Sequence, residues 1–388
     1  SNTTLTSAGG AIVTGAIIGT SSEDLTITSS GGGTNTVVTN GTIGASGNIN
    51  TIAITGATSV SLGGNISTND ASGNTVTVTG TTIDTNDITV DTNNTNNDGN
   101  ITFNLDTFPD SVTIDAGGAV MQMTPVTTDA VIESARTNSG NISEDVFYDV
   151  DLVDITNAAH VLIGSSSHTG NIFWGNDSAA LAFSASANLV LQNSSSGQIL
   201  LSSDYTSANG FLTLTSGNGV TLQDLSSNGT ATINLGSGAL TVTGATTLAD
   251  NVNITATGGI SFSSTIDADN AGSNDRTLTM TSGTGSTIAV AGNIGGGSGL
   301  AGLTITQSNG TTFSGNVNVN DVNGGGGTIT VTDTENGADI TFAGSVITKT
   351  LDLAQTGYDL IFNGGATFTD AVTFDNTGTL NLGNASGD

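Results

Sequence analysis

The stretch from Leu303 to Gly344 places the strongest constraint on the fold of this chain. It contains four short runs in which apolar and polar residues alternate, and Gly, Asn, Asp and Ser separate them. The runs are Leu303–Ile305, Val317–Val319, Ile329–Val331 and Ile340–Phe342. Alternation with a period of two is typical of half-buried β-strands, and the polar clusters between the runs are typical of turns. Because no part of the stretch has a helical period, the sequence predicts short strands joined by turns.

Similar alternating triplets recur along the chain at a drifting interval. One series of triplets begins at Leu25, Ile52, Val76 and Ile101. A second series, near the other end of the chain, begins at Leu278, Leu303, Ile329 and Leu351. Coils of roughly 22–27 residues, each with three short strands and turns of variable length, account for these intervals and are typical of a β-solenoid. We therefore predict an all-β solenoid in which one face of each strand lines an apolar interior.

A glycine motif lies inside this repeat. An apolar residue is followed two positions later by Gly and, after two more, by a second apolar residue. Examples are Leu62/Gly64/Ile66, Val290/Gly292/Ile294, Phe313/Gly315/Val317 and Phe342/Gly344/Val346. Glycine inside a strand marks a bend, a bulge or a close approach of two backbones. We expect it to mark the corner between two sheets, where a positive φ at Gly344 would make a β-branched residue destabilising.

Residues 104–174 interrupt the regular pattern. This stretch contains both prolines, both histidines, the single Trp and several acidic residues. The sequence therefore predicts three segments. Residues 1–103 form solenoid coils whose first strand-like stretch, Leu5 to Ile18, acts as a cap or an assembly strand. Residues 104–178 form irregular coils or an insertion, and residues 179–388 form solenoid coils again.

The charge of the chain excludes several kinds of partner. Three Lys plus Arg stand against 33 Asp plus Glu, which gives a formal net charge of −30. Nucleic acid and anionic membrane surfaces repel such a polyanion, so we expect neither as a direct partner. No apolar run reaches the length of about 18 residues that a membrane helix needs, so we expect no membrane insertion. No signal-peptide pattern opens the chain, and we expect that an exported form has already lost that segment or that this is part of a longer protein.

Two runs carry a resemblance to a known group of proteins. They are TITVTDTENGADITFAGSV, from Thr328, and ATFTDAVTFDNTGTLNLG, from Ala366. Both resemble the β-strand repeats of large bacterial surface proteins, including filamentous-haemagglutinin-like adhesins and autotransporter passengers. The resemblance is compositional and periodic and covers most of the chain, least well over 104–174. It implies a secreted, right-handed parallel β-helix in a Gram-negative-type envelope and carries over no catalytic residue.

Acidic turns are the first candidate site. The candidate ligands for Ca²⁺ are Asp91, Asp98, Asp267, Asp269, Asp333 and Glu335, because hard cations bind oxygen ligands in such loops. No calcium-binding nonapeptide array occurs, and Leu105 stands where an EF-hand loop would need its bidentate Glu. Asp and Asn are also the ordinary residues of solvated turns. We therefore expect no cofactor and at most weak Ca²⁺ screening, and we expect His160 and His168 to cap or pack rather than to bind a metal.

Carbohydrate cleavage is the second candidate chemistry. Glycoside hydrolysis requires two carboxylates that face one bond, and the acidic cluster offers Glu144, Asp145, Asp149 and Asp151, with Trp174 as a surface on which a sugar could stack. A polysaccharide lyase would also need a cationic base, and the chain has few cations. The competing interpretation, which the sequence favours, is an irregular acidic insertion with Trp174 packed beneath it.

These observations together predict an extracellular structural protein rather than an enzyme. Its solenoid would form a rigid rod at a cell surface and act as an adhesin or scaffold, with host or cell-surface glycans as partners. A variant of this hypothesis is end-to-end assembly of identical copies into a filament or a surface layer, because the end strands of a solenoid are open edges. The alternative is a polysaccharide-active β-helix enzyme with an acidic site around residues 144–174.

Overall fold

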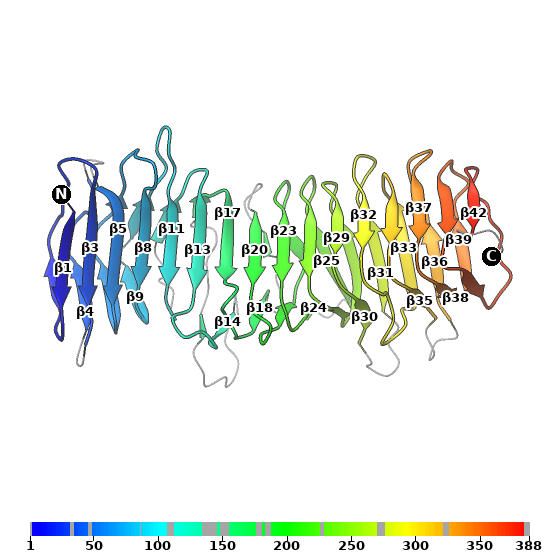
Figure 1. The fold of residues 1–388 in the computed structure, drawn as a ribbon, viewed down its shortest axis with the longest axis horizontal. Helices are drawn as coiled ribbons and strands as arrows, with labels where there is room; N and C mark the ends of the chain where they lie inside the picture. The colour runs from blue at the N-terminus through cyan, green and yellow to red at the C-terminus, as the bar shows by residue number, and fades with distance from the viewer. Residues whose placement is uncertain are drawn as a thin grey trace. The chain divides into compact units, whose positions relative to one another are not determined.

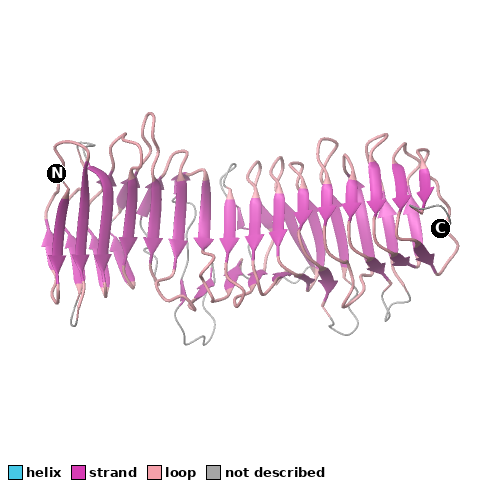
Figure 2. Cartoon of the chain, in the orientation of Figure 1, coloured by secondary structure: helices cyan, strands magenta, loops and turns pink. Residues whose placement is uncertain are grey.

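The structure is a computed structural model of residues 1–388. It describes residues 2–31, 35–45, 49–85, 87–106, 112–133, 146–147, 155–175, 181–182, 188–225, 229–269, 276–320 and 326–383. Within these residues the strands pair in parallel and no helix occurs, so the predicted all-β solenoid is confirmed (Figure 2). The chain divides into two compact units. Unit 1 comprises Ser1–Ile172 and Ala187–Ser194, and unit 2 comprises Phe173–Ser186 and Ser195–Asp388.

Unit 1 is built from ladders of parallel strands (Figure 1). The first ladder contains β1 (Thr3–Ser7), β3 (Glu23–Ser29), β5 (Ile49–Gly56), β8 (Thr75–Thr79), β11 (Asn100–Asn104), β13 (Val120–Thr124), β17 (His160–Gly164) and β20 (Leu189–Gln192). The second contains β2 (Ile12–Thr14), β4 (Thr36–Thr39), β6 (Ser59–Leu62) and β9 (Thr82–Thr85). The third contains β7 (Ile66–Ser67), β10 (Ile88–Asp91), β12 (Val112–Asp115) and β16 (Ile155–Asn157), and β14 (Val131–Glu133) pairs with β15 (Val146–Phe147).

Unit 2 has the same organisation. Its first ladder contains β23 (Leu212–Thr215), β26 (Leu240–Thr243), β29 (Ile260–Phe262), β32 (Ile288–Val290), β34 (Thr311–Phe313), β37 (Asp339–Phe342), β40 (Asp359–Phe362) and β42 (Leu380–Leu382). A second side contains β18 (Ile172–Trp174), β21 (Ile199–Leu201), β24 (Val220–Leu222), β27 (Thr246–Leu248) and β30 (Ile266–Ala268), then β35 (Val317–Val319), β38 (Val346–Thr348) and β41 (Ala366–Phe368). The third ladder contains β19 (Leu181–Ala182), β22 (Tyr205–Thr206), β25 (Thr230–Asn234), β28 (Asn251–Thr255), β31 (Thr277–Thr281), β33 (Gly302–Gln307), β36 (Thr328–Val331) and β39 (Thr350–Leu353).

The strand register confirms the coil spacing that the sequence predicts. Consecutive partners in one ladder of unit 1 are Leu25, Ile52, Val76 and Ile101. Consecutive partners in one ladder of unit 2 are Leu278, Leu303, Ile329 and Leu351. Coil length varies more widely than the predicted range, because Leu240 pairs with Ile260 across a shorter coil and Thr311 pairs with Ile340 across a longer one. The difference lies in the turns, which can change length at the surface without disturbing the stacked strands.

The interior consists of columns of inward-facing apolar side chains, one residue from each coil. One column of unit 2 runs through Phe262, Val290, Phe313, Phe342 and Phe362. These side chains are buried, whereas the Thr, Ser and Asn residues between them on each strand stay partly exposed. The ring of Phe342 stacks on those of Phe313 and Phe362 with centroid distances of 5.0 Å on both sides. The burial of large apolar and aromatic surface in these columns is the main force that holds the coils together.

The glycine motif lies at corners of the solenoid, as predicted. Gly315 lies between β34 and β35, and Gly344 lies between β37 and β38. Gly344 does not have a positive φ, so the strain that a positive φ would impose on a β-branched residue does not arise there. A different constraint applies, because a Cβ on Gly344 would lie 2.6 Å from the carbonyl carbon and oxygen of Gly315. A Cβ on Gly315 would lie 2.5 Å from the same atoms of Gly292. Glycine is required here because successive backbones approach closely.

The stretch that interrupts the sequence pattern still contributes strands to unit 1. Met121 and Met123 of β13 pair with Ile101 and Phe103 and are buried in the same columns. On the other side Met121 pairs with Val161, so this coil is much longer than its neighbours. Residues 134–145 and 148–154, which belong to the long coil, lie outside the described residues.

Candidate functional site

The acidic turn residues of unit 1 accept hydrogen bonds from main-chain N–H groups. Asp98 Oδ1 accepts from the N–H of Asn94 at 2.9 Å, and Oδ2 accepts from the N–H of Gly118, one coil on, at 2.6 Å. Asp91 Oδ1 accepts from the N–H of Asn93 at 2.9 Å. Bonds of this kind satisfy a carboxylate without a cation. Asp91, at the end of β10, and Asp98, in the loop that follows, therefore stabilise this loop themselves, and Asp98 also ties one coil to the next.

Asp70 makes the same kind of contact, and the sequence interpretation missed it. Its Oδ1 accepts from the N–H groups of Asn96 and Asn97 at 2.9 and 2.8 Å, and its Oδ2 accepts from Asn96 Nδ2 at 2.6 Å. The partners lie 26 and 27 residues later, which is one coil. The hydrogen bond from the Asn96 main chain lowers the pKa of the Asp70 carboxyl, because it stabilises the ionised form. An acidic residue and an amide one coil apart, both in turns, form the pattern that could have revealed this contact.

The candidate residues of unit 2 are engaged separately. Asp267 Oδ1 accepts from the N–H of Gly297 at 2.6 Å and from that of Ser298 at 3.3 Å. Asp333 Oδ2 accepts from Gln307 Nε2 at 3.2 Å. Glu335 donates its own main-chain N–H to the carbonyl of Ser308 at 3.0 Å in the adjacent coil. Within the part of the chain that the structure describes, no three His, Cys, Asp or Glu side chains come together in a group that could hold a metal ion.

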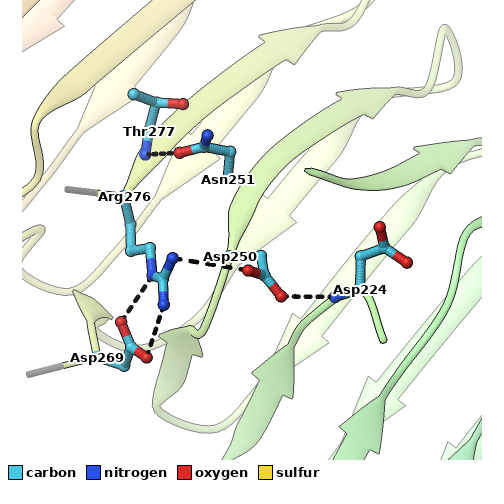
Figure 3. A network of polar contacts seen from close by, with 6 residues as sticks. All are labelled: Asp224, Asp250, Asn251, Asp269, Arg276 and Thr277. Carbon is cyan, nitrogen blue, oxygen red and sulfur yellow. Dashed lines mark hydrogen bonds and ion pairs between the residues drawn. The ribbon is translucent and has the colours of Figure 1, made fainter. Parts of the chain in front are cut away.

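Asp269 belongs to a polar network rather than to a cation site (Figure 3). Arg276 donates to it through two atoms, Nε to Oδ1 at 2.7 Å and Nη2 to Oδ2 at 3.0 Å. Arg276 Nη1 also lies 3.6 Å from Asp250 Oδ1, and Asp250 Oδ2 accepts from the N–H of Asp224 at 2.9 Å. The hydrogen bond to Asp269 raises the pKa of the Arg276 guanidinium. Arg276 thereby links the turns of two successive coils, and the Asp250 carboxylate extends the network to a third coil.

Replacement of Arg276 by Gln should destabilise unit 2. It removes a two-point, charge-assisted contact whose Arg side chain is only 11% exposed, and such bonds contribute about 1.5–3 kcal/mol each. Because the partly exposed carboxylates can recover water, we expect a net loss of about 1–3 kcal/mol in the free energy of unfolding, measured by urea denaturation. Lys349→Gln removes the same charge, and the described residues give Lys349 no ion pair, so this control should change stability by less than about 0.5 kcal/mol. Equal losses in the two variants would contradict the assigned role of Arg276.

The carbohydrate candidate is described only at Trp174. Glu144, Asp145, Asp149 and Asp151 lie outside the described residues. Trp174 ends β18 with 0% of its surface exposed, and Ile172 of the same strand is equally buried. A fully buried indole is not available to stack on a sugar ring. The burial of Trp174 therefore disagrees with the proposed sugar contact and agrees with the interpretation that it packs beneath the surface.

The two histidines lie in different environments within unit 1. His168 is in the turn after β17 and is 1% exposed, whereas His160 begins β17 and is partly exposed. Burial lowers the pKa of the His168 imidazole because the cation is poorly solvated there, although the nearby Thr128 main chain and the charge of Asp129 favour protonation. His168 is thus packed in the interior, as expected from the sequence.

This burial predicts a loss of stability in mild acid. Unfolded histidine takes up a proton at its usual pKa, but folded His168 does so only at lower pH. The unfolded state is therefore favoured as the pH falls through the usual histidine pKa of about 6.5, and stability is complete above that pH range. His168→Gln should make the free energy of unfolding depend less on pH in this window, and His160→Gln should have a smaller effect. Carboxyls with a lowered pKa, such as Glu23 at about 2, titrate below the window. An unchanged pH dependence in His168→Gln would contradict the prediction.

Of the six candidate calcium ligands, Asp98, Asp267 and Asp333 thus contact a neighbouring coil through their side chains. The described residues include no helix that is long and apolar enough to cross a membrane. Comparison with known proteins finds no matching family model, no matching curated protein and no matching solved structure.

Proposed function

We propose that this chain is an extracellular structural protein, a solenoid scaffold at a cell surface with an adhesive or display role. The observation that supports this proposal is the use made of acidic residues in the turns and in one strand. Asp70, Asp98 and Asp267 each accept hydrogen bonds from main-chain N–H groups one coil away. Groups that could bind a ligand therefore hold the stack of coils together, as expected of a protein whose stability is its function.

The composition supports a protein that is exposed to proteases. The whole chain offers three Lys plus Arg residues to trypsin-like enzymes. Of these, Arg276 is held in the network with Asp269. A protease can cleave a paired strand only after that strand opens locally. Such opening is rare where each strand has a partner on both sides.

Labelling of intact source cells tests the proposed location. Antibodies against the purified chain should label cells that have not been permeabilised, and treatment of whole cells with a broad-specificity protease should remove the signal. A cytoplasmic control protein should stay unlabelled in the same sample. Labelling that requires permeabilisation would overturn the proposal. A glycan array probed with the folded chain would then test the adhesive role directly.

Exposed apolar side chains on the edge strands support a second part of the proposal, end-to-end assembly with identical copies. Leu5 of β1 is 36% exposed, although its partner Ile27 is fully buried. Leu382 of β42 is 60% exposed, although its partner Phe362 is buried. An edge strand also presents unpaired N–H and C=O groups. A second copy that pairs with such an edge would continue the ladder through a heterologous contact, which produces filaments.

Negative-stain microscopy tests this assembly, with and without millimolar Ca²⁺. We expect fibres or sheets that lengthen with protein concentration and are lost when residues 1–18 are deleted. Leu5→Asp should have the same effect, because it places a charge in the apolar column. Thr4→Asp, on the outward face of the same strand, is the matched control and should still assemble. Isolated particles at every concentration would contradict end-to-end assembly and leave the scaffold proposal standing.

The enzyme alternative requires its own test, because four of its carboxylates lie outside the described residues. A panel of neutral and acidic polysaccharides would be incubated with the folded chain. Turnover that is lost in Asp149→Asn or Asp151→Asn would replace the scaffold proposal with the polysaccharide-active alternative. No turnover across the panel would remove that alternative.

A further inference from the structure

Six neighbouring strands of unit 1 present one continuous outward surface. Figure 1 shows β1, β3, β5, β8, β11 and β13 side by side and pointing the same way. Two neighbouring columns of their outward side chains are here called the threonine face, and a further outward column, which includes Asp24 and Thr51, lies beside them. The threonine face comprises Thr4, Thr6, Thr26, Thr28, Ala53, Thr55, Thr77, Thr79, Thr102, Asn104, Gln122 and Thr124. Nine of these twelve residues are threonine.

The parallel register arranges these side chains as a two-dimensional lattice. Thr4 pairs with Thr26 and Thr6 with Thr28, and the same two columns continue through Thr77 and Thr79. Neighbouring strands lie about 4.8 Å apart, and every second residue along a strand lies about 6.6 Å away. Hydroxyl and methyl groups therefore recur at two regular spacings across the face. Oxygen atoms on the faces of crystalline ice also recur in a regular two-dimensional lattice with repeats of a few ångströms.

Most hydroxyls of the threonine face keep their hydrogen-bonding capacity for an external partner. Among the described residues, seven of the threonines form no intramolecular side-chain hydrogen bond: Thr4, Thr6, Thr26, Thr28, Thr55, Thr77 and Thr102. Each hydroxyl can donate one hydrogen bond and accept others. This is the opposite of the turns, where carboxylates such as Asp98 already accept from the neighbouring coil. The unused polar groups of this region are thus on the sheet face.

The two columns carry no charge in a chain with 33 acidic residues, although Asp24 stands at an outward position of β3 in the adjacent column. None of the twelve positions in the two columns carries Asp, Glu, Lys or Arg. A charged partner would find no complementary group there. Small ligands bind in concave pockets rather than on a row of short side chains. No aromatic ring stands at any of the twelve positions to stack on a sugar. The partner that fits is extended, flat, neutral and periodic, and it both donates and accepts hydrogen bonds.

We propose that the threonine face binds ice. Water molecules at an ice surface form a fixed lattice of donors and acceptors, which the hydroxyls can join while the methyl groups occupy the spaces between them. The corresponding ladder of unit 2 also carries outward threonines, such as Thr213, Thr241 and Thr312. There the lattice is interrupted more often, because Ala289, Ala291, Ala343 and Ile361 stand at other outward positions. The activity is therefore assigned to unit 1. It goes beyond the scaffold role and does not depend on it, because ice binding can be measured on the isolated chain.

Ice growth in a solution of the full chain tests this proposal. We expect the folded wild-type chain to shape ice crystals into facets, to lower the freezing point below the melting point and to inhibit recrystallisation. The double variant Thr28→Lys/Thr77→Lys places two charges in the lattice and should lose these effects to the level of buffer. Ala289→Lys places a charge at an exposed outward position of the corresponding unit 2 ladder and should keep them. Circular dichroism would verify that all three proteins are folded.

Several results would overturn the proposal. A folded wild-type chain without faceting, freezing-point difference or recrystallisation inhibition would do so, whatever the variants show. Retention of full activity in the double variant would also do so. Sedimentation of the chain with crystalline cellulose or chitin, without any effect on ice, would assign the face to a neutral polysaccharide instead. If the double variant fails to fold, Thr77→Val replaces it, because it removes a hydroxyl without adding a charge.

Discussion

Phe342→Ala should lower the free energy of unfolding of unit 2 by about 3–5 kcal/mol, the usual cost of truncating a buried phenylalanine. Phe342 is 1% exposed and is the middle ring of three, with centroids 5.0 Å from those of Phe313 and Phe362. Its removal would leave a cavity in the interior and deprive two rings of a stacking partner at once. Because a solenoid interior is one residue wide in each column, little else is available to fill the space.

Two controls separate the contributions to this loss. Phe342→Leu keeps most of the apolar volume but removes the stacking, which contributes about 0.5–1.5 kcal/mol beyond burial, and should be the milder variant. Phe368→Ala removes a partly exposed ring that meets Phe362 edge-on at 6.0 Å, and should also cost less. Stacked repeats can unfold in parts, so urea denaturation should be accompanied by hydrogen exchange of β34 and β40. A loss below about 1 kcal/mol in Phe342→Ala would contradict the role of the ring column.

The coil repeat was predictable because burial alternates on every strand. The spacing from Leu25 to Ile52, Val76 and Ile101 is the strand register itself. The sequence did not reveal which strands share a ladder. Leu303, Val317 and Ile340 look alike in the sequence but belong to three different ladders. The ladder to which a strand belongs depends on the path of the turn before it. One or two residues decide the conformation of a turn, so that path is hard to predict from the sequence.

The polar contacts were less predictable than the strands, for a related reason. Asp269 was interpreted as a candidate calcium ligand, but the path of the chain brings it to Arg276, seven residues later. Asp70 reaches Asn96 because two turns of successive coils are superimposed, which the sequence reveals only after the register is known. An acidic residue near one of the few cations was a usable signal for the first contact. The role of Trp174 could not be predicted from the sequence, because a tryptophan can either stack on a sugar or pack in the interior. Only its burial in the structure distinguishes the two roles.

The corner glycines predict a second large effect. Gly344→Ala should lower the free energy of unfolding by about 2–4 kcal/mol, because overpacking a site whose surroundings cannot yield costs at least about 1–3 kcal/mol. The added methyl carbon would lie 2.6 Å from the carbonyl carbon and oxygen of Gly315. Those atoms are backbone, so relief requires the two coils to move apart. Their separation is held by the pairing of β37 with β34 and of β38 with β35.

Gly285→Ala is the matched control, because it has no positive φ and a Cβ there would meet nothing within 4 Å. Alanine at such a position restricts the unfolded chain and should stabilise by about 0.4–1 kcal/mol or leave stability unchanged. The two variants make the same chemical change, so any difference between them in urea denaturation measures the close approach of the backbones. Similar stabilities would mean that the corner can open without cost. A destabilised Gly344→Ala beside a neutral Gly285→Ala would show that the spacing between coils is fixed by main-chain contact at the corners as well as by strand pairing along the faces.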